Sequence, residues 1–84
     1  MQITFKLYAS LTDYLPPDRR RDNRMPLDVP ADAPIAKIIE PFGMPPKLVH
    51  LVLVNGVFVP PEERATRTLV EGDVLAIWPP IAGG

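Results

Sequence analysis

Side chains that could perform catalysis are few in this 84-residue sequence. His50 is the only histidine and cysteine is absent, so the residues that normally complete a zinc site are missing. Ser10 is the only serine and lies outside the Gly-x-Ser-x-Gly pattern that presents a nucleophilic serine. Glu62 and Glu63 are neighbours in a proline-flanked segment and point in different directions, so solvation explains them better than acid–base catalysis. We therefore expect neither a metal site nor a stand-alone enzyme.

The end of the sequence is its most unusual feature. The last six residues are Pro79, Pro80, Ile81, Ala82, Gly83 and Gly84. A glycine pair adds nothing to a hydrophobic core and is costly to order. The preceding prolines stiffen the backbone and would project the glycines away from the folded part. The pair is either incidental, or Gly84 is the group on which another protein acts.

Alternation of apolar and polar residues predicts β-strands over residues 2–8, 25–29 and 74–78. Residues 47–61 predict a further strand, which is rich in β-branched side chains and places His50 near its middle. This strand runs into Asn55-Gly56, a strong hairpin signal, and then into a short return strand.

Residues 30–42 are the one good candidate for a helix. Asp32 is placed to cap its start and Pro34 is tolerated in the first turn. Pro41 and Gly43 end it. The predicted order is strand, strand, helix, strand, short strand, strand.

This order predicts an α+β fold in which one main helix packs on a mixed sheet of four to five strands. If the last strand lies in the middle of the sheet beside the first, the fold is a ubiquitin-like β-grasp, a topology that we take from analogy. We expect residues 1–78 to form this domain and residues 79–84 to form a projecting tail.

One face of the predicted sheet has more apolar residues than a solvent-exposed sheet face usually has. Alternation places His50 and Val52 on one face of their strand, and Ala76 and Trp78 on one face of theirs. Large aromatic side chains at a surface are favoured interface anchors. We therefore expect a partner-binding surface made of Trp78, Ala76, Val52 and His50. In the alternative, Trp78 folds over the edge of the core and the valines reflect only strand propensity.

The charge balance argues against nucleic acid as a partner, because nine basic and ten acidic side chains give a net charge of −1. No apolar run approaches the roughly 20 residues of a membrane-spanning helix. We expect a cytoplasmic domain. The arginine-rich residues 18–24 are expected to form a solvated loop, more readily than a site for an acidic partner.

The end of the sequence, LVEGDVLAIWPPIAGG, resembles the C-terminus of the small subunits of molybdopterin synthase, MoaD. Its acidic-Gly-Asp turn, aromatic strand end, Pro-Pro and Gly-Gly carry the resemblance. VLVNGVFV resembles the preceding hairpin of that family, and KLYASLTDYL its first strand and turn. The thiamine sulfur carriers, ThiS, share the fold and the Gly-Gly but usually lack the Pro-Pro, so MoaD is the more similar. The proline- and arginine-rich residues 16–25 and the short helical region depart from the MoaD pattern.

The resemblance implies that the protein is a sulfur carrier with no bound cofactor. A ubiquitin-activating-type adenylyltransferase of the MoeB/ThiF kind would use ATP and magnesium to adenylate the carboxylate of Gly84. A sulfur donor protein would convert the adenylate to a thiocarboxylate, which a MoaE-like large subunit would use on a pterin precursor. Gly83, which has no side chain, would let the backbone before Gly84 pass through the partner's narrow channel. Ile81 would be an apolar contact in that channel, and Trp78 would be part of the docking surface.

Two alternatives from other classes stay open. A ubiquitin-like modifier would form isopeptides through the same Gly84, and a plain β-grasp interaction domain would not use it. Within the carrier class, a ThiS-like role in thiazole synthesis is the alternative to molybdopterin.

Overall fold

The structure is a computed structural model, and it describes residues 1–80. The predicted tail residues Ile81, Ala82, Gly83 and Gly84 lie outside the described residues. The strands are β1 (Gln2–Leu7), β2 (Arg24–Asp28), β3 (Leu51–Val54), β4 (Val57–Phe58) and β5 (Val74–Trp78). The α-helix is α1 (Ile35–Ile39), and 3-10 helices cover Ala9–Tyr14, Pro17–Arg19, Glu40–Phe42, Pro46–Leu48 and Pro61–Glu63.

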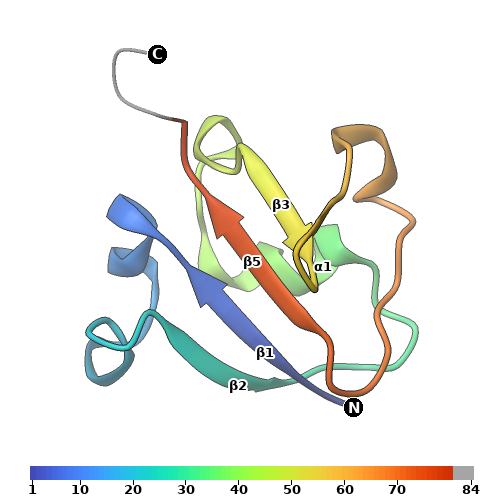
Figure 1. The fold of residues 1–84 in the computed structure, drawn as a ribbon, viewed down its shortest axis with the longest axis horizontal. Helices are drawn as coiled ribbons and strands as arrows, with labels where there is room; N and C mark the ends of the chain where they lie inside the picture. The colour runs from blue at the N-terminus through green and yellow to red at the C-terminus, as the bar shows by residue number, and fades with distance from the viewer. Residues whose placement is uncertain (81–84) are drawn as a thin grey trace.

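The strands form one mixed sheet in the order β2-β1-β5-β3-β4 (Figure 1). β5 pairs in parallel with β1 and antiparallel with β3, and the two outer pairings are antiparallel. The last strand therefore lies in the middle of the sheet beside the first, as predicted. The predicted β-grasp fold and the order of its elements are confirmed.

The hydrophobic core lies between α1 and one face of the sheet. Its largest fully buried side chains are Phe5, Leu7, Leu11, Leu15, Ile35, Val52, Val59, Leu75 and Ile77. Phe42, from the 3-10 turn after α1, stacks on Phe5 with the ring centroids 4.4 Å apart. This face of the sheet is thus closed by the helical segment and the loops around it.

The helix is shorter than predicted, and its cap is not Asp32. The N-cap is Pro34, which is extended and makes a bridge with Thr68. The N–H groups of Ile35 and Ala36 donate to the carbonyls of Arg67 and Arg64, each at 2.9 Å. Because loop carbonyls accept from these N–H groups, no capping side chain is present. The prediction of Asp32 as the cap is therefore wrong.

Two turns at one end of the sheet are joined through Asn55 and Asp73. Asn55 and Gly56 both have positive φ, 51° and 82°, as a tight hairpin turn between β3 and β4 requires. The amide of Asn55 donates to Asp73 Oδ1 at 2.9 Å and accepts from the N–H of Val74 at 2.9 Å. Asp73 Oδ2 accepts from the N–H of Val70 at 3.0 Å. Both predicted turns therefore form, and they hold each other in place.

We expect Asp73→Ala to lower the free energy of unfolding by about 1–3 kcal/mol, because it leaves partly buried donors without an acceptor. Asp32→Ala is the control, since Asp32 is exposed and caps nothing; its effect should stay within about 0.5 kcal/mol. Urea unfolding followed by circular dichroism measures both. Equal effects for the two variants would contradict this account of the turns.

Candidate functional site

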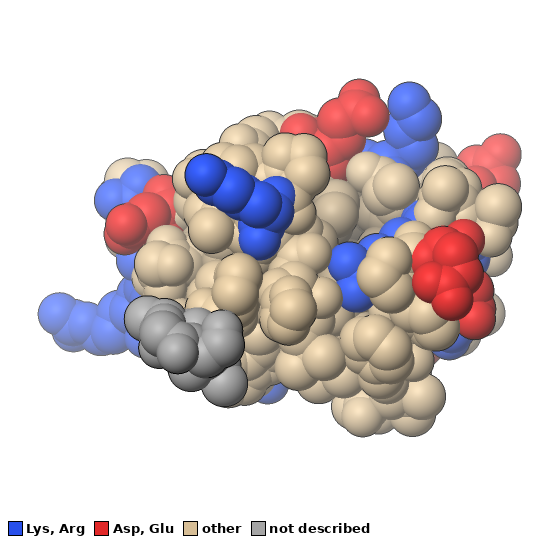
Figure 2. Space-filling model, turned by 90° about the horizontal axis from the view of Figure 1, so that it is seen from above, with Lys and Arg blue, Asp and Glu red and all other residues tan. Residues whose placement is uncertain are grey.

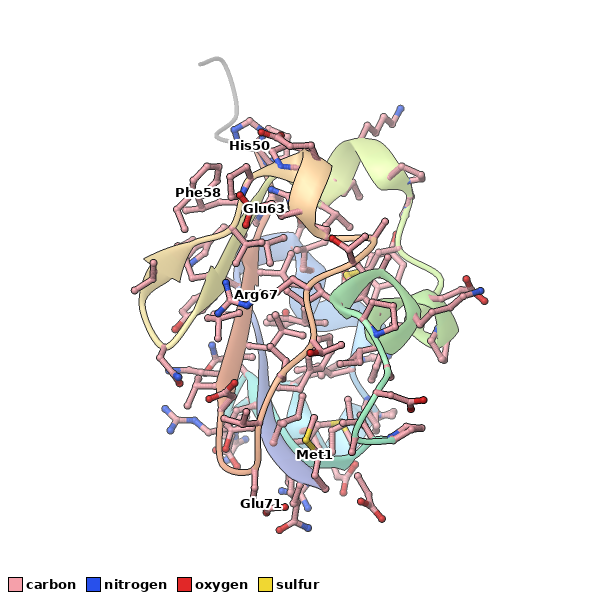
Figure 3. The ribbon with its side chains drawn as sticks, turned by 90° about the vertical axis from the view of Figure 1, so that its right-hand side faces the viewer. Met1, His50, Phe58, Glu63, Arg67 and Glu71 are labelled. Atoms are coloured by element: carbon pink, nitrogen blue, oxygen red, sulfur yellow. The ribbon has the colours of Figure 1, made fainter. Side chains whose placement is uncertain are left out.

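The face of the sheet away from α1 carries the exposed side chains of Phe58 and Trp78, and we call it the outer face. Strand register defines it as a row that crosses all five strands. The residues of this row are Arg24, Lys6, Ala76, Leu53 and Phe58. Figure 3 shows Phe58 pointing away from α1. The row is basic on β2 and β1 and apolar on β5, β3 and β4.

An aromatic pair stands beside this row, at the end of β5. The rings of Tyr8 and Trp78 are stacked with centroids 3.8 Å apart and an angle of 6° between their planes. Lys6 Nζ lies 5.7 Å from the centroid of the Tyr8 ring. Such pairs contribute about 0.5–1.5 kcal/mol beyond the area they bury. The stack on Tyr8 holds the Trp78 ring in one orientation. Trp78 is still 38% exposed, so part of its ring can contact a partner.

Trp78 and Ala76 both belong to the outer face, as predicted. Trp78 lies opposite Leu51 on β3, and Ala76 lies between Lys6 and Leu53. Ala76 is only 8% exposed, so it forms the floor of the surface between larger neighbours. Phe58 is 50% exposed and extends the apolar part to the edge strand.

Val52 lies on the core face of the sheet and not on the outer face. It pairs with Ile77, faces the core and has no exposed surface, so its predicted place in a partner-binding surface is wrong. Leu51 and Leu53 occupy the outer face of β3 in its place. Both faces of this strand are apolar, and alternation alone does not tell which set of side chains faces inward.

His50 precedes β3, so the prediction that it lies within a strand is wrong. Its side chain is exposed, and its backbone N–H donates to the carbonyl of Trp78 at 3.2 Å. His50 is therefore adjacent to the end of β5, where Figure 3 shows it at the opposite end of the molecule from Met1 and Glu71.

Arg64 is a structural residue that the sequence did not reveal. Its guanidinium donates to the carbonyls of Val59, Val49 and His50 at 3.2, 3.2 and 3.0 Å. Partial burial lowers the pKa of Arg64, and the carboxylate of Glu62 opposes this by raising it. The side chain ties the segment before β3 to the segment after β4. It thereby positions His50 against β5.

A hollow of about 360 Å³ lies away from the outer face, between α1 and the segment before β3. Its lining is mostly apolar, with Glu40 and Arg64 as its charged residues. Within residues 1–80, no cluster of His, Cys, Asp or Glu is arranged to hold a metal ion. The described part of the chain also has no helix long and apolar enough to span a membrane. The outer face is thus the strongest candidate for a functional surface.

The start of the predicted tail follows directly from β5. Pro79 is half-buried and Pro80 is exposed. Both lie beyond Trp78, at the end of the central strand. The predicted roles of Ile81, Ala82, Gly83 and Gly84 fall outside the described residues.

A β-grasp sheet with one uncovered face and a C-terminal segment leaving its central strand defines a ubiquitin-like protein. The chain belongs to the Mut7-C ubiquitin family, whose model matches residues 1–82. This family match confirms the predicted ubiquitin-like architecture, which small sulfur carriers of the MoaD and ThiS type share. The narrower assignment to MoaD stays a prediction.

Solved structures with similar folds come from Haloferax volcanii. The crystal structure of SAMP1 has a TM-score of 0.68 and 21% sequence identity, with 100% of both chains covered. The solution structure of the HVO 2177 protein has a TM-score of 0.74 and 19% identity, covering 100% of this chain and 87% of the other. A second crystal structure, of small archaeal modifier protein 1, has a TM-score of 0.65 and 21% identity, covering 95% and 98%. No curated protein matches the chain.

The assignment of Val52 to the core is testable with a matched pair of variants. Val52→Ala should lower the free energy of unfolding by about 1.5–3 kcal/mol, from lost burial plus a cavity. Val57→Ala is the control, because Val57 is 65% exposed, and it should cost less than about 0.5 kcal/mol. Denaturant unfolding measures both. A smaller loss for Val52→Ala than for Val57→Ala would contradict the assignment.

Proposed function

We propose that this protein is a sulfur carrier that delivers sulfur as a thiocarboxylate on Gly84. The observation that carries the proposal is the outer face, which is exposed, partly apolar and adjacent to the end of the strand that leads into the tail. Family membership and the Gly-Gly ending support it. The protein itself would not be catalytic; the groups that perform the chemistry would belong to its partners.

The proposed chemistry has two steps. A carboxylate oxygen of Gly84 attacks the α-phosphorus of ATP, pyrophosphate leaves, and an acyl-adenylate forms. Hydrosulfide then attacks the carbonyl carbon and AMP leaves. The first step is needed because oxide is a poor leaving group, whereas AMP is a good one. With hydrosulfide as donor, the products are the thiocarboxylate, AMP and one proton.

Glycine at positions 83 and 84 suits both the entry of the tail into an active site and the attack on its carbonyl carbon. Gly83 and Gly84 carry no Cβ, so the backbone can enter a narrow channel and the carbonyl carbon is open to attack. Pro79 and Pro80 restrict the backbone between the sheet and these residues. Ile81 and Ala82 would provide small apolar contacts in the channel.

The outer face would dock the activating enzyme while the tail enters its active site. Trp78 is the proposed anchor, because it is partly exposed and already fixed by its stack on Tyr8. Ala76 provides the floor beneath it, and His50 lies at its side. Preorganised side chains lose little entropy on binding, so this arrangement favours association.

The proposed partners are a MoeB/ThiF-like adenylyltransferase that uses ATP and magnesium, a sulfur donor protein, and an acceptor enzyme. The MoaD-like ending favours a MoaE-like acceptor and molybdopterin, in a molybdenum or tungsten cofactor. A ThiS-like role in thiazole synthesis is the alternative pathway. Both pathways require the same activation of Gly84.

Protein modification through Gly84 is the second candidate function. The specific observation in its favour is the similarity in fold to small archaeal modifier protein 1, over 95% of this chain. A modifier would pass the activated carbonyl to a lysine amine and form an isopeptide, with AMP as the leaving group. The first step is shared, so only the fate of the adenylate separates the two functions.

The test is an intact mass after incubation with the adenylyltransferase of the same organism, ATP, magnesium and sulfide. We expect a mass increase equal to replacement of one oxygen by sulfur, because sulfide displaces AMP. The chain without Gly84 should show no change. Absence of the increase in the full chain would contradict the carrier function.

A parallel incubation in cell extract with ATP separates the modifier. High-mass adducts that carry this chain and are lost on deletion of Gly84 would favour modification over sulfur transfer. If neither the mass increase nor the adducts appear, the plain interaction domain is favoured.

A further inference from the structure

The arginine-rich segment, residues 18–24, is mostly exposed, as predicted for a solvated loop, and hydrogen bonds hold it in place. Asn23 joins it to the end of β1 in both directions: the N–H of Leu7 donates to the carbonyl of Asn23 at 3.0 Å, and the amide of Asn23 donates to the carbonyl of Leu7 at 3.2 Å. Arg20 donates to the carbonyls of Leu15 and Asp13, each at 3.0 Å. We call this segment the arginine loop.

Arg20 and Asn23 anchor the loop through these hydrogen bonds. Arg19 has only a long contact with Asp18, with 4.0 Å between Nε and Oδ2. Among the described residues, Arg21, Arg24 and Lys6 make no ion pair. Cations gathered on one exposed surface attract an anionic partner.

These cations adjoin the apolar part of the outer face. Arg24 is opposite Lys6, and Lys6 is opposite Ala76. Arg19 and Arg24 also line a hollow of about 420 Å³ over β1 and β2, which contains one carboxylate, that of Asp22. Neighbouring strands lie about 4.8 Å apart, so the basic and apolar parts are side by side. Figure 2 shows Lys and Arg side chains, with acidic side chains between them, at the left edge of the molecule.

We propose that the outer face is a docking surface in two parts, whose basic part binds acidic side chains of a protein partner. Lys6, Arg19 and Arg24 would face a strip of Asp and Glu, while Leu53, Phe58 and Trp78 pack on an adjacent apolar patch. This inference rests on the proposed function, and the partner to which it commits is the adenylyltransferase. The basic part sets the orientation and the rate of encounter, and the apolar part provides the burial.

Two other occupants fit the surface less well. A second copy of the chain would bring the same cations against each other, because Asp22 is the only acid that lines this hollow. Single-stranded nucleic acid needs free aromatic faces for its bases. Here one ring face of Trp78 is covered by Tyr8, and the aliphatic residues Leu51, Leu53 and Ala76 make the centre of the apolar part. A protein surface with a strip of Asp and Glu beside an apolar patch complements both parts of the outer face.

The test compares two double variants that change the net charge equally. Lys6→Glu with Arg24→Glu reverses the proposed contacts, and Lys47→Glu with Arg67→Glu is the matched control. Arg67 lies in the segment between β4 and β5, on the other side of the molecule from the arginine loop (Figures 1 and 3). Lys47 and Arg67 are exposed, and their side chains make no hydrogen bond among the described residues. Thermal unfolding verifies that all variants are folded.

Association with the adenylyltransferase is followed by stopped-flow fluorescence of Trp78 at increasing salt. We expect the Lys6/Arg24 variant to lose about tenfold or more of the association rate at low salt, and to lose most of its salt dependence. The control should stay within about twofold of the wild type, because its charges lie outside the contact. Equal losses in both variants, or no loss in the first, would overturn the inference.

Wild-type ATP–pyrophosphate exchange distinguishes this inference from the proposed function. No exchange at any salt concentration would overturn the proposed function itself. Exchange with an association rate that is insensitive to Lys6 and Arg24 would overturn only the two-part surface. A labelled oligothymidine that binds the wild type but not the Lys6/Arg24 variant, with enzyme association unchanged, would assign the basic part to nucleic acid instead.

Discussion

The hydrogen-bonded position of β5 is the constraint on which the rest of the structure depends. β5 is bonded to β1 on one side and to β3 on the other, so its alternate side chains are fixed to opposite faces. Leu75 and Ile77 close the core, while Ala76 and Trp78 are directed to the outer face. Because β5 is the last strand within residues 1–80, Pro79 and Pro80 continue from the middle of the sheet. The same strand therefore stabilises the fold and positions the candidate surface.

Polar contacts at both ends of the sheet hold β5 in this position. Asn55 and Asp73 join the turns at its start, and Arg64 joins the segments near its end. One short helix packs on a single face of the sheet, and the opposite face carries the exposed side chains of Phe58 and Trp78. A docking protein then meets a rigid surface, which lowers the entropic cost of binding. In the proposed function, this surface would orient the chain while the carboxylate of Gly84 reaches the activating enzyme.

The sequence predicted the elements and the Asn55-Gly56 turn, because alternation and turn residues are local signals. The β-grasp topology was predicted by analogy, since no local pattern contains the order of strands in a sheet. It predicted the places of Ala76 and Trp78 but not of Val52, since both faces of β3 are apolar and only its register with β5 decides between them. Asp32 was a plausible cap, but loop carbonyls accept from the first helical N–H groups instead. The roles of Arg64, Arg20 and Asn23 depend on contacts between distant segments, which no local pattern contains.

The most direct test of the docking surface is an amide NMR titration of the isotope-labelled chain with the adenylyltransferase and ATP. The largest changes should fall on β1, β3 and β5, at Leu53, Ala76 and Trp78 above all, with little change in α1. Changes confined to α1 and the loops that cover the core face would contradict the account. In that case the partner would bind the helical side, and the outer face would not guide activation of Gly84.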